Sequence, residues 1–199
     1  MRMLLNCLII LASLFVNTVF AGTIVLNTAD DYPLSTADGR GYEDLIITEA
    51  FRRMGMQVRI VHLPSERALV NANTGIDDGN FVRIEGIEEI YPDLVRVPEK
   101  ITEFEFAAFT KDPSVRTCEW NSLAPFSVGI ITGWKILEAN VVGTRSLTKV
   151  SGPEALFALL AHDRVDLVVY DRRQGIAEIR RQGIAGIRPL TPLLARQDM

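Results

Sequence analysis

The chain has 199 residues, of which 48% are hydrophobic and 23% are charged, and its formal net charge is −4. The ordinary charged fraction and the spread of apolar residues exclude an intrinsically disordered chain. The acidic balance argues against a nucleic-acid-binding protein. The length suits one domain or two small lobes.

The N-terminal residues have the pattern of a secretory signal peptide. Arg2 precedes an apolar stretch over residues 4–20, and Val19 and Ala21 are the small or branched residues expected before a cut after Ala21. The alternative is a retained membrane anchor, but polar residues such as Asn17 shorten the stretch below the roughly 20 residues that span a bilayer. We therefore expect an exported, periplasmic protein that begins at residue 22.

Export limits what the two cysteines can do. Cys7 lies in the expected signal peptide, so Cys118 would be the single cysteine of the mature chain and could form no internal disulfide. We expect Cys118 to be a buried apolar side chain, with a free thiol as the alternative.

Strands and helices alternate through the first half of the mature chain. The patterns predict strands at 24–28, 57–62, 80–83, 94–97 and 104–110, and helices at 43–54 and 65–73. In the first helix Ile47, Ala50, Phe51 and Met54 share one face, which we expect to be buried. Because this helix joins the first two strands, we expect those strands to be parallel.

The second half repeats this alternation. Strands are predicted at 127–131, 147–150, 165–170 and 187–190, with helices after Gly133, from Ser151 and at 172–182. Ser151 and Glu154 have the spacing of a capping box. The whole pattern predicts an α/β protein with two parallel-sheet lobes, and we place the first crossover between them near residue 109.

A short repeat lies in the last predicted helix, where the six residues from Arg172 recur from Arg180. This period is too short for a solenoid. The paired arginines favour a solvated helix face, with an anion-docking patch as the alternative.

Several segments, taken together, resemble one known family. They are Tyr32-Pro33 after the first strand, then residues 67–79, 91–98, 127–133 and 163–171. In order and spacing they are similar to the type 2 periplasmic solute-binding proteins, in particular the family-3 group that serves polar amino-acid uptake, over residues 22–199. The resemblance implies a Venus-flytrap fold, in which two lobes joined by hinge strands close on a small ligand, without a cofactor.

The resemblance also implies a division of the chain. We expect a signal peptide over residues 1–21, lobe 1 over 22–109, lobe 2 over 110–187 and a return crossover towards lobe 1 over 188–199. Members of the family continue into a helical C-terminal piece that packs on the first lobe, and we expect that piece to be missing here.

The expected ligand site lies beyond the carboxyl ends of the strands, near helix N-termini, as in other open parallel sheets. The residues placed there are Asp31, Tyr32, Arg67, Arg83, Thr132, Gly133 and Asp171. They offer a guanidinium and a helix N-terminus for a carboxylate, and carboxylates for an ammonium group. This set suits an amino acid or a related zwitterion.

Two of these residues have structural alternatives. The resemblance assigns Asp171 to the ligand's α-amino group, whereas Asp171 could also cap the helix at 172–182. Arg83 stands closer to the preceding glycine-aspartate segment than the family's carboxylate-binding arginine does. It could instead pair with Glu85 or Glu88.

Catalytic and metal-binding motifs are absent from the sequence. His62 and His162 stand alone, without a further ligand at metal-site spacing, and there is no Gly-x-Ser-x-Gly or phosphate-binding motif. We expect a non-enzymatic, monomeric solute-binding protein without metal, which serves an ABC-type permease or a sensor. The alternatives are an enzyme on the same fold, similar to cyclohexadienyl dehydratase with Glu66 or Asp171 as general acid, and a stand-alone sensory module.

Overall fold

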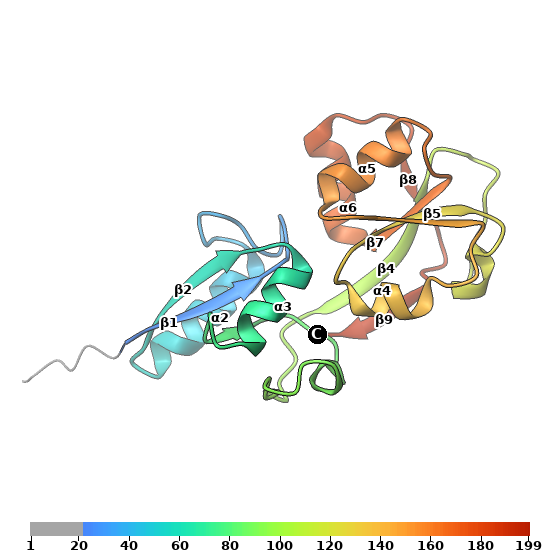
Figure 1. Cartoon of the computed structure of the whole chain (residues 1–199). Coiled ribbons are helices and arrows are strands. Elements are labelled where there is room, and N and C mark those ends of the chain that lie inside the picture. The colour runs from blue at the N-terminus through green and yellow to red at the C-terminus, as the bar shows by residue number, and fades with distance from the viewer. Residues whose placement is uncertain (1–21) are drawn as a thin grey trace, which may run out of the picture.

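The computed structural model describes residues 22–199, and the expected signal peptide lies outside the described residues. Two lobes lie side by side, each with its own sheet (Figure 1). The elements in chain order are β1 (Thr23–Thr28), α2 (Tyr42–Arg53), β2 (Gln57–His62), α3 (Ser65–Asn73), β3 (Gly79–Asn80), η1 (Ile87–Glu89), β4 (Glu103–Thr110), η2 (Trp120–Leu123), β5 (Ser127–Ile131), α4 (Lys135–Asn140), β6 (Ser146–Val150), α5 (Pro153–Ala161), β7 (Leu167–Asp171), α6 (Arg172–Gln182), β8 (Arg188–Pro189) and β9 (Ala195–Asp198). None of the helices in this part of the chain is long and apolar enough to cross a membrane.

The first lobe is a three-stranded parallel sheet in the order β2-β1-β3. The α2 helix packs on β2, and α3 packs on β1 and β3 (Figure 1). The predicted parallel pairing of the first two strands is confirmed, with Thr28 opposite His62 at their carboxyl ends. These two ends meet at the edge of the lobe where α3 begins.

The buried face of α2 differs from the predicted one. Ile47 is buried, but Met54 and Ala50 are exposed, and the first turn buries Glu43 and Asp44 instead. The reason is that this turn packs under the polar loop that follows β1, where the Asp44 carboxylate accepts hydrogen bonds from the Thr36 and Gly41 backbone N–H groups.

The second lobe contains a six-stranded mixed sheet, in the order β6-β5-β7-β4-β8, with β9 also paired to β4. The strands β5, β6 and β7 are parallel, whereas β4 runs antiparallel to its partners β7, β8 and β9. The core is aromatic. Trp134 stacks on Tyr170 with ring centroids 4.7 Å apart, and Phe109 meets Phe157 edge-on at 5.2 Å.

The lobe boundary lies earlier in the chain than we expected. We expected residues 104–109 in lobe 1, but β4 is an interior strand of the second sheet. Its last residues are buried without alternation, as expected for a strand covered on both faces. Residues 188–199 do not join the first sheet either, because β8 and β9 both pair with β4.

Three local predictions are wrong. Residues 94–97 form no strand, because no neighbouring strand pairs with them, and Val95 is 91% exposed. Cys118 is exposed rather than buried. The α5 helix begins after Gly152 without a side-chain cap, so the predicted capping box of Ser151 and Glu154 does not form.

Candidate functional site

Two cavities lie between the lobes. One, of about 250 Å³, is bounded by the ends of β1 and β2 and the start of α3 on the first lobe, and by Ile131, Trp134 and residues 151–153 on the second. The other, of about 670 Å³, extends past Asp31 and Tyr32 along α5 and α6. Because Asp31 and residues 151–153 line both cavities, they are two parts of one space, the interlobe cleft.

Two helices begin at the cleft from opposite lobes. The N-cap residues are Pro64 for α3 and Gly152 for α5, and neither makes a side-chain capping hydrogen bond. The first backbone N–H groups of a helix have no partner within the helix, and its N-terminus carries a partial positive charge. The smaller cavity is therefore suited to a carboxylate or another anion.

Acidic residues line the same cleft. Asp31 contributes to both cavities, and burial, followed by the nearby Glu178 carboxylate, raises the pKa of its carboxyl group. Tyr32 lines the larger cavity and is 67% exposed, so it lies at the rim. The carboxyl groups can accept hydrogen bonds from an ammonium group.

Asp30 and Glu43 form a buried carboxyl pair beside the cleft. Asp30 is 5% exposed and Glu43 is fully buried, and the two carboxyl groups lie within hydrogen-bonding reach of each other. Burial raises the pKa of Asp30 to about 7, and burial together with the Asp30 charge raises the pKa of Glu43 to about 10. Burial therefore favours the protonated forms of both carboxyl groups. The Asp30 Oδ2 atom and both carboxyl oxygens of Glu43 have no hydrogen-bond partner among the described residues.

Arg83 is buried next to this pair. Its guanidinium donates to Asn80 and to the Ser65 Oγ atom, at 2.9 Å for the latter. Burial lowers the pKa of Arg83 to about 10, and the charge of Asp30 opposes that change. The proposed pairing of Arg83 with Glu85 or Glu88 does not form; Glu85 pairs with Arg96.

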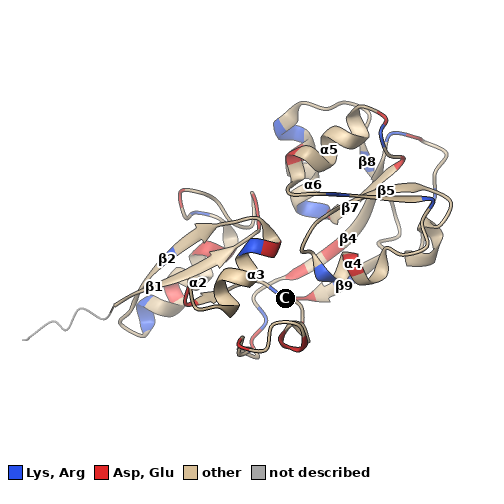
Figure 2. Ribbon diagram, in the orientation of Figure 1, with Lys and Arg blue, Asp and Glu red and all other residues tan. Residues whose placement is uncertain are grey.

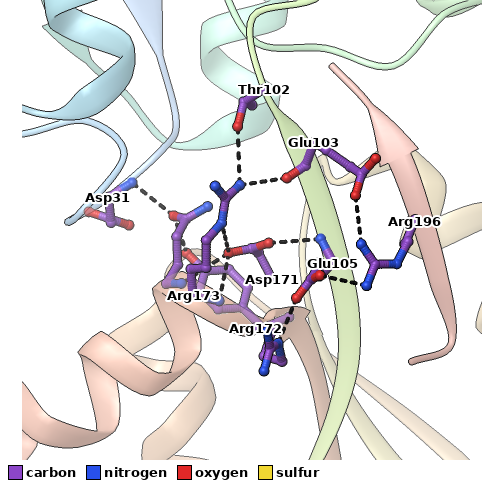
Figure 3. A network of polar contacts seen from close by, with 10 residues as sticks. Asp31, Thr102, Glu103, Glu105, Asp171, Arg172, Arg173 and Arg196 are labelled. Carbon is purple, nitrogen blue, oxygen red and sulfur yellow. Dashed lines mark hydrogen bonds and ion pairs between the residues drawn. The ribbon is translucent and has the colours of Figure 1, made fainter. Parts of the chain in front are cut away.

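Asp171 acts as a helix cap in this structure. Its Oδ1 atom accepts hydrogen bonds from the backbone N–H groups of Arg173 and Gln174, both at 3.0 Å. Its Oδ2 atom accepts from the Glu105 N–H group on β4, also at 3.0 Å (Figure 3). The carboxylate is completely buried. These contacts join α6 to β4 and use both oxygens.

Other expected residues contact the opposite lobe or lie outside the cleft. The Gly133 carbonyl accepts a hydrogen bond from the Ser65 Oγ atom at 3.0 Å. Thr132 donates its backbone N–H to Val150 in the second sheet and lines neither cavity of the cleft. Arg67 is exposed on α3 and also lines neither cavity.

Direct contacts join the two lobes beside the cleft. Lys135 at the start of α4 forms an ion pair with Glu66 on α3 at 2.6 Å, in addition to the Ser65–Gly133 hydrogen bond. In Figure 2 the start of α3 carries adjacent acidic and basic residues on the side of the first lobe that faces the second. Gly133 has a φ of +85°, and a Cβ atom there would lie 2.4 Å from the Glu66 backbone nitrogen.

The sequence patterns did not assign several cleft residues to the site. They are His62, Trp134, Ser151, Gly152, Pro153 and Gln174. Of these residues, only Gly152 and Pro153 have a sequence pattern that indicates the site. A proline at the first position of a helix marks a helix N-terminus directly after a predicted strand. Among the described residues, no group of three or more His, Cys, Asp or Glu side chains is placed to hold a metal ion.

Comparison with known sequences gives one distant relative. No family model matches the chain. An uncharacterized protein of Shewanella oneidensis is 27% identical over 134 residues, which are 64% of this chain and 50% of that protein. The match therefore spans half the length of the relative.

Comparison with solved structures shows the fold. An ancestral arginine-binding protein bound to glutamine has a TM-score of 0.74 at 18% identity, covering 90% of this chain and 82% of that one. Holo ArgBP from T. maritima has a TM-score of 0.73 at 18% identity, covering 89% and 80%. A histidine kinase sensor domain with similarity to periplasmic binding proteins reaches 0.76 at 20% identity, also covering 89% and 80%. The chain thus has the α/β fold of periplasmic binding proteins.

Proposed function

We propose that the protein binds a small polar solute, an amino acid or a related zwitterion, in the interlobe cleft. The observation that carries this proposal is that groups suited to an anion and groups suited to a cation line the same interlobe cleft. The N-termini of α3 and α5 suit a carboxylate, and the Asp30 and Asp31 carboxyl groups suit an ammonium group. Neighbours of the same fold that bind arginine or glutamine support the same ligand class.

In this proposal the protein is exported, binds its solute in the periplasm and delivers it to an ABC-type transporter. A substrate-binding protein of an amino acid ABC transporter has a TM-score of 0.70 at 15% identity and supports this role. The sensor domain among the neighbours supports a second candidate, in which the same ligand-driven closure signals to a receptor kinase.

The contacts of Asp171 and Glu66, the two candidate general acids, support binding rather than catalysis. Asp171 is buried with both oxygens bonded to backbone N–H groups. Glu66 accepts hydrogen bonds from the Tyr91 hydroxyl at 2.7 Å and from Lys135 at 2.6 Å, and its pKa is lowered. A general acid needs a proton to give near neutral pH, and these contacts favour the ionised form of Glu66.

A ligand screen by thermal unfolding tests the proposal. The twenty L-amino acids, polyamines and small carboxylates are added separately, and the melting temperature is compared with that of the free protein. A ligand at a hundredfold excess over its dissociation constant stabilises the folded state by about 2.7 kcal/mol. We expect at least one amino acid to raise the melting temperature. No response from any of these classes would contradict the proposal.

A further inference from the structure

His62 lies where the strands β1 and β2 end and lines the smaller cavity of the interlobe cleft. Its Nε2 atom is 2.7 Å from the Oγ atom of Ser35, a buried residue in the loop after β1. His62 therefore has one ring nitrogen fixed by the first lobe while the ring borders the cleft.

A buried carboxylate decides the direction of that hydrogen bond. The Ser35 hydroxyl donates its single proton to the Oδ1 atom of Asp44. The other oxygen of Asp44 accepts from the backbone N–H groups of Thr36, at 2.8 Å, and Gly41, at 3.0 Å. Asp44 is fully buried and its oxygens are occupied by donors, so Ser35 can only accept at its remaining contact.

It follows that the His62 Nε2 atom carries a proton and donates it to Ser35. In the neutral imidazole one nitrogen is a donor and the other is an acceptor, and the hydrogen bond of one nitrogen sets the state of the other. The Nδ1 atom of His62 then has a free lone pair. No partner for Nδ1 is found among the residues that the structure describes.

We propose that His62 is a ligand-binding residue whose Nδ1 atom accepts a hydrogen bond from a donor group of the solute, an ammonium or hydroxyl group. Asp44 and Ser35 are positioning residues that fix the ring and its tautomer. This inference rests on the proposed function and adds the orientation of the solute in the cleft. The donor group of the solute lies on the first-lobe side, beside His62 and Asp31, and its carboxylate faces the start of α5.

Two substitutions distinguish the contributions of the two His62 ring nitrogens to solute binding. His62→Gln can keep a donor near the position of Nε2 for the Ser35 contact but has no atom at Nδ1, whereas His62→Asn keeps a polar atom near Nδ1. We expect His62→Gln to weaken binding about tenfold, as for one lost hydrogen bond, and His62→Asn to keep part of the affinity. The matched control is His162→Gln, because His162 is exposed and follows the far end of α5.

Nitrogen NMR of protein labelled with 15N-histidine tests the tautomer directly, because the full chain has two histidines. We expect the His62 Nε2–H tautomer in the free protein and a mixture of tautomers in Ser35→Ala. The probe is each L-amino acid that raises the melting temperature, together with its carboxylic acid lacking the amino group. The amino acid, and not its amine-free analogue, should shift the His62 Nδ1 resonance while His162 stays unchanged.

The outcomes separate this inference from the proposed function. Binding of an amino acid with an unchanged His62 Nδ1 resonance, or equal affinity in His62→Gln, overturns the role of His62 and leaves the proposed function standing. The role of His62 is also overturned if the neutral imidazole of His62 in the free protein carries its proton on Nδ1. No binding of any amino acid overturns the proposed function, and the inference with it.

Discussion

The backbone N–H of Asp31, on the first lobe, donates a hydrogen bond to the side-chain oxygen of Gln174 on α6, at 3.0 Å. The Tyr170 hydroxyl donates to the same oxygen at 3.1 Å. Both contacts fix the orientation of the Gln174 amide, whose Nε2 atom has no partner among the described residues. Gln174 also lines the cleft, so these contacts join the first lobe to the cleft-facing side of α6.

Replacing Gln174 with alanine should destabilise the protein by about 1–3 kcal/mol, because two buried donors lose their acceptor. Chemical denaturation measures this change in the free energy of unfolding. Gln57→Ala is the control, because Gln57 is exposed at the start of β2, and it should change stability by less than about 0.5 kcal/mol. Equal effects of the two substitutions would show that the Asp31–Gln174 contact contributes nothing.

Replacing Asp171 with alanine should cost about 2 kcal/mol of stability or more. The substitution removes the N-cap of α6 and the acceptor for the Glu105 N–H. Asp171→Asn keeps an acceptor oxygen and should lose less. Unchanged stability in the alanine variant, combined with loss of amino-acid binding, would instead assign Asp171 to the ligand's ammonium group.

The Asp30–Glu43 pair should make stability depend on pH. The ordinary pKa values are 3.8 and 4.5, and in the folded protein they are raised to about 7 and about 10. The folded state therefore holds more protons than the unfolded state above about pH 4, and the free energy of unfolding falls as pH rises towards 7 and beyond.

The double variant Asp30→Asn with Glu43→Gln tests this dependence. It should lose the fall in stability between pH 5 and pH 8, which we expect to be on the order of 1 kcal/mol per pH unit. Glu99→Gln, at an exposed position, serves as the control and should keep the wild-type profile. A wild-type profile in the double variant would mean that the pKa values of Asp30 and Glu43 are not raised in the folded protein.

Lys135 should stabilise the closed arrangement of the lobes through its ion pair with Glu66. Lys135→Gln should weaken amino-acid binding by up to about 1 kcal/mol, and the difference should shrink at high salt. Lys149→Gln is the control, because Lys149 pairs with Glu138 inside the second lobe. Small-angle X-ray scattering should show a larger radius of gyration for Lys135→Gln alone. Equal scattering from both variants would contradict this role.

Local patterns predicted much of the fold. Asp171 and Gly183 bound α6 at the residues expected, because an N-cap carboxylate and a glycine in the left-handed conformation are local features. Local patterns could not predict which of the two sheets contains β4. Its apolar residues fit either lobe, and its pairing with β7 and β9 depends on chain segments far along the sequence.

The site was harder to predict, because its contacts join distant residues. Asp31 and Gln174 are 143 positions apart, and Ser35 and His62 are 27 apart. His62 stands alone in the sequence, and nothing near it in the chain indicates that it lies at a cleft. Asp30 and Glu43 are 13 positions apart, and only the fold brings these two buried carboxyl groups close enough for the Asp30 charge to raise the pKa of Glu43.

Closure of the two lobes on a solute is the central claim, and Gly133→Ala tests it most directly. A Cβ atom there would meet the Glu66 backbone of the other lobe. Gly143→Ala is the matched control, because Gly143 also has a positive φ, of +67°, but nothing lies within 4 Å of the added atom. We predict that calorimetric titration with an amino acid that stabilises the wild type shows binding to Gly143→Ala and at least a tenfold loss in Gly133→Ala. Equal binding by the two variants would contradict closure at this contact.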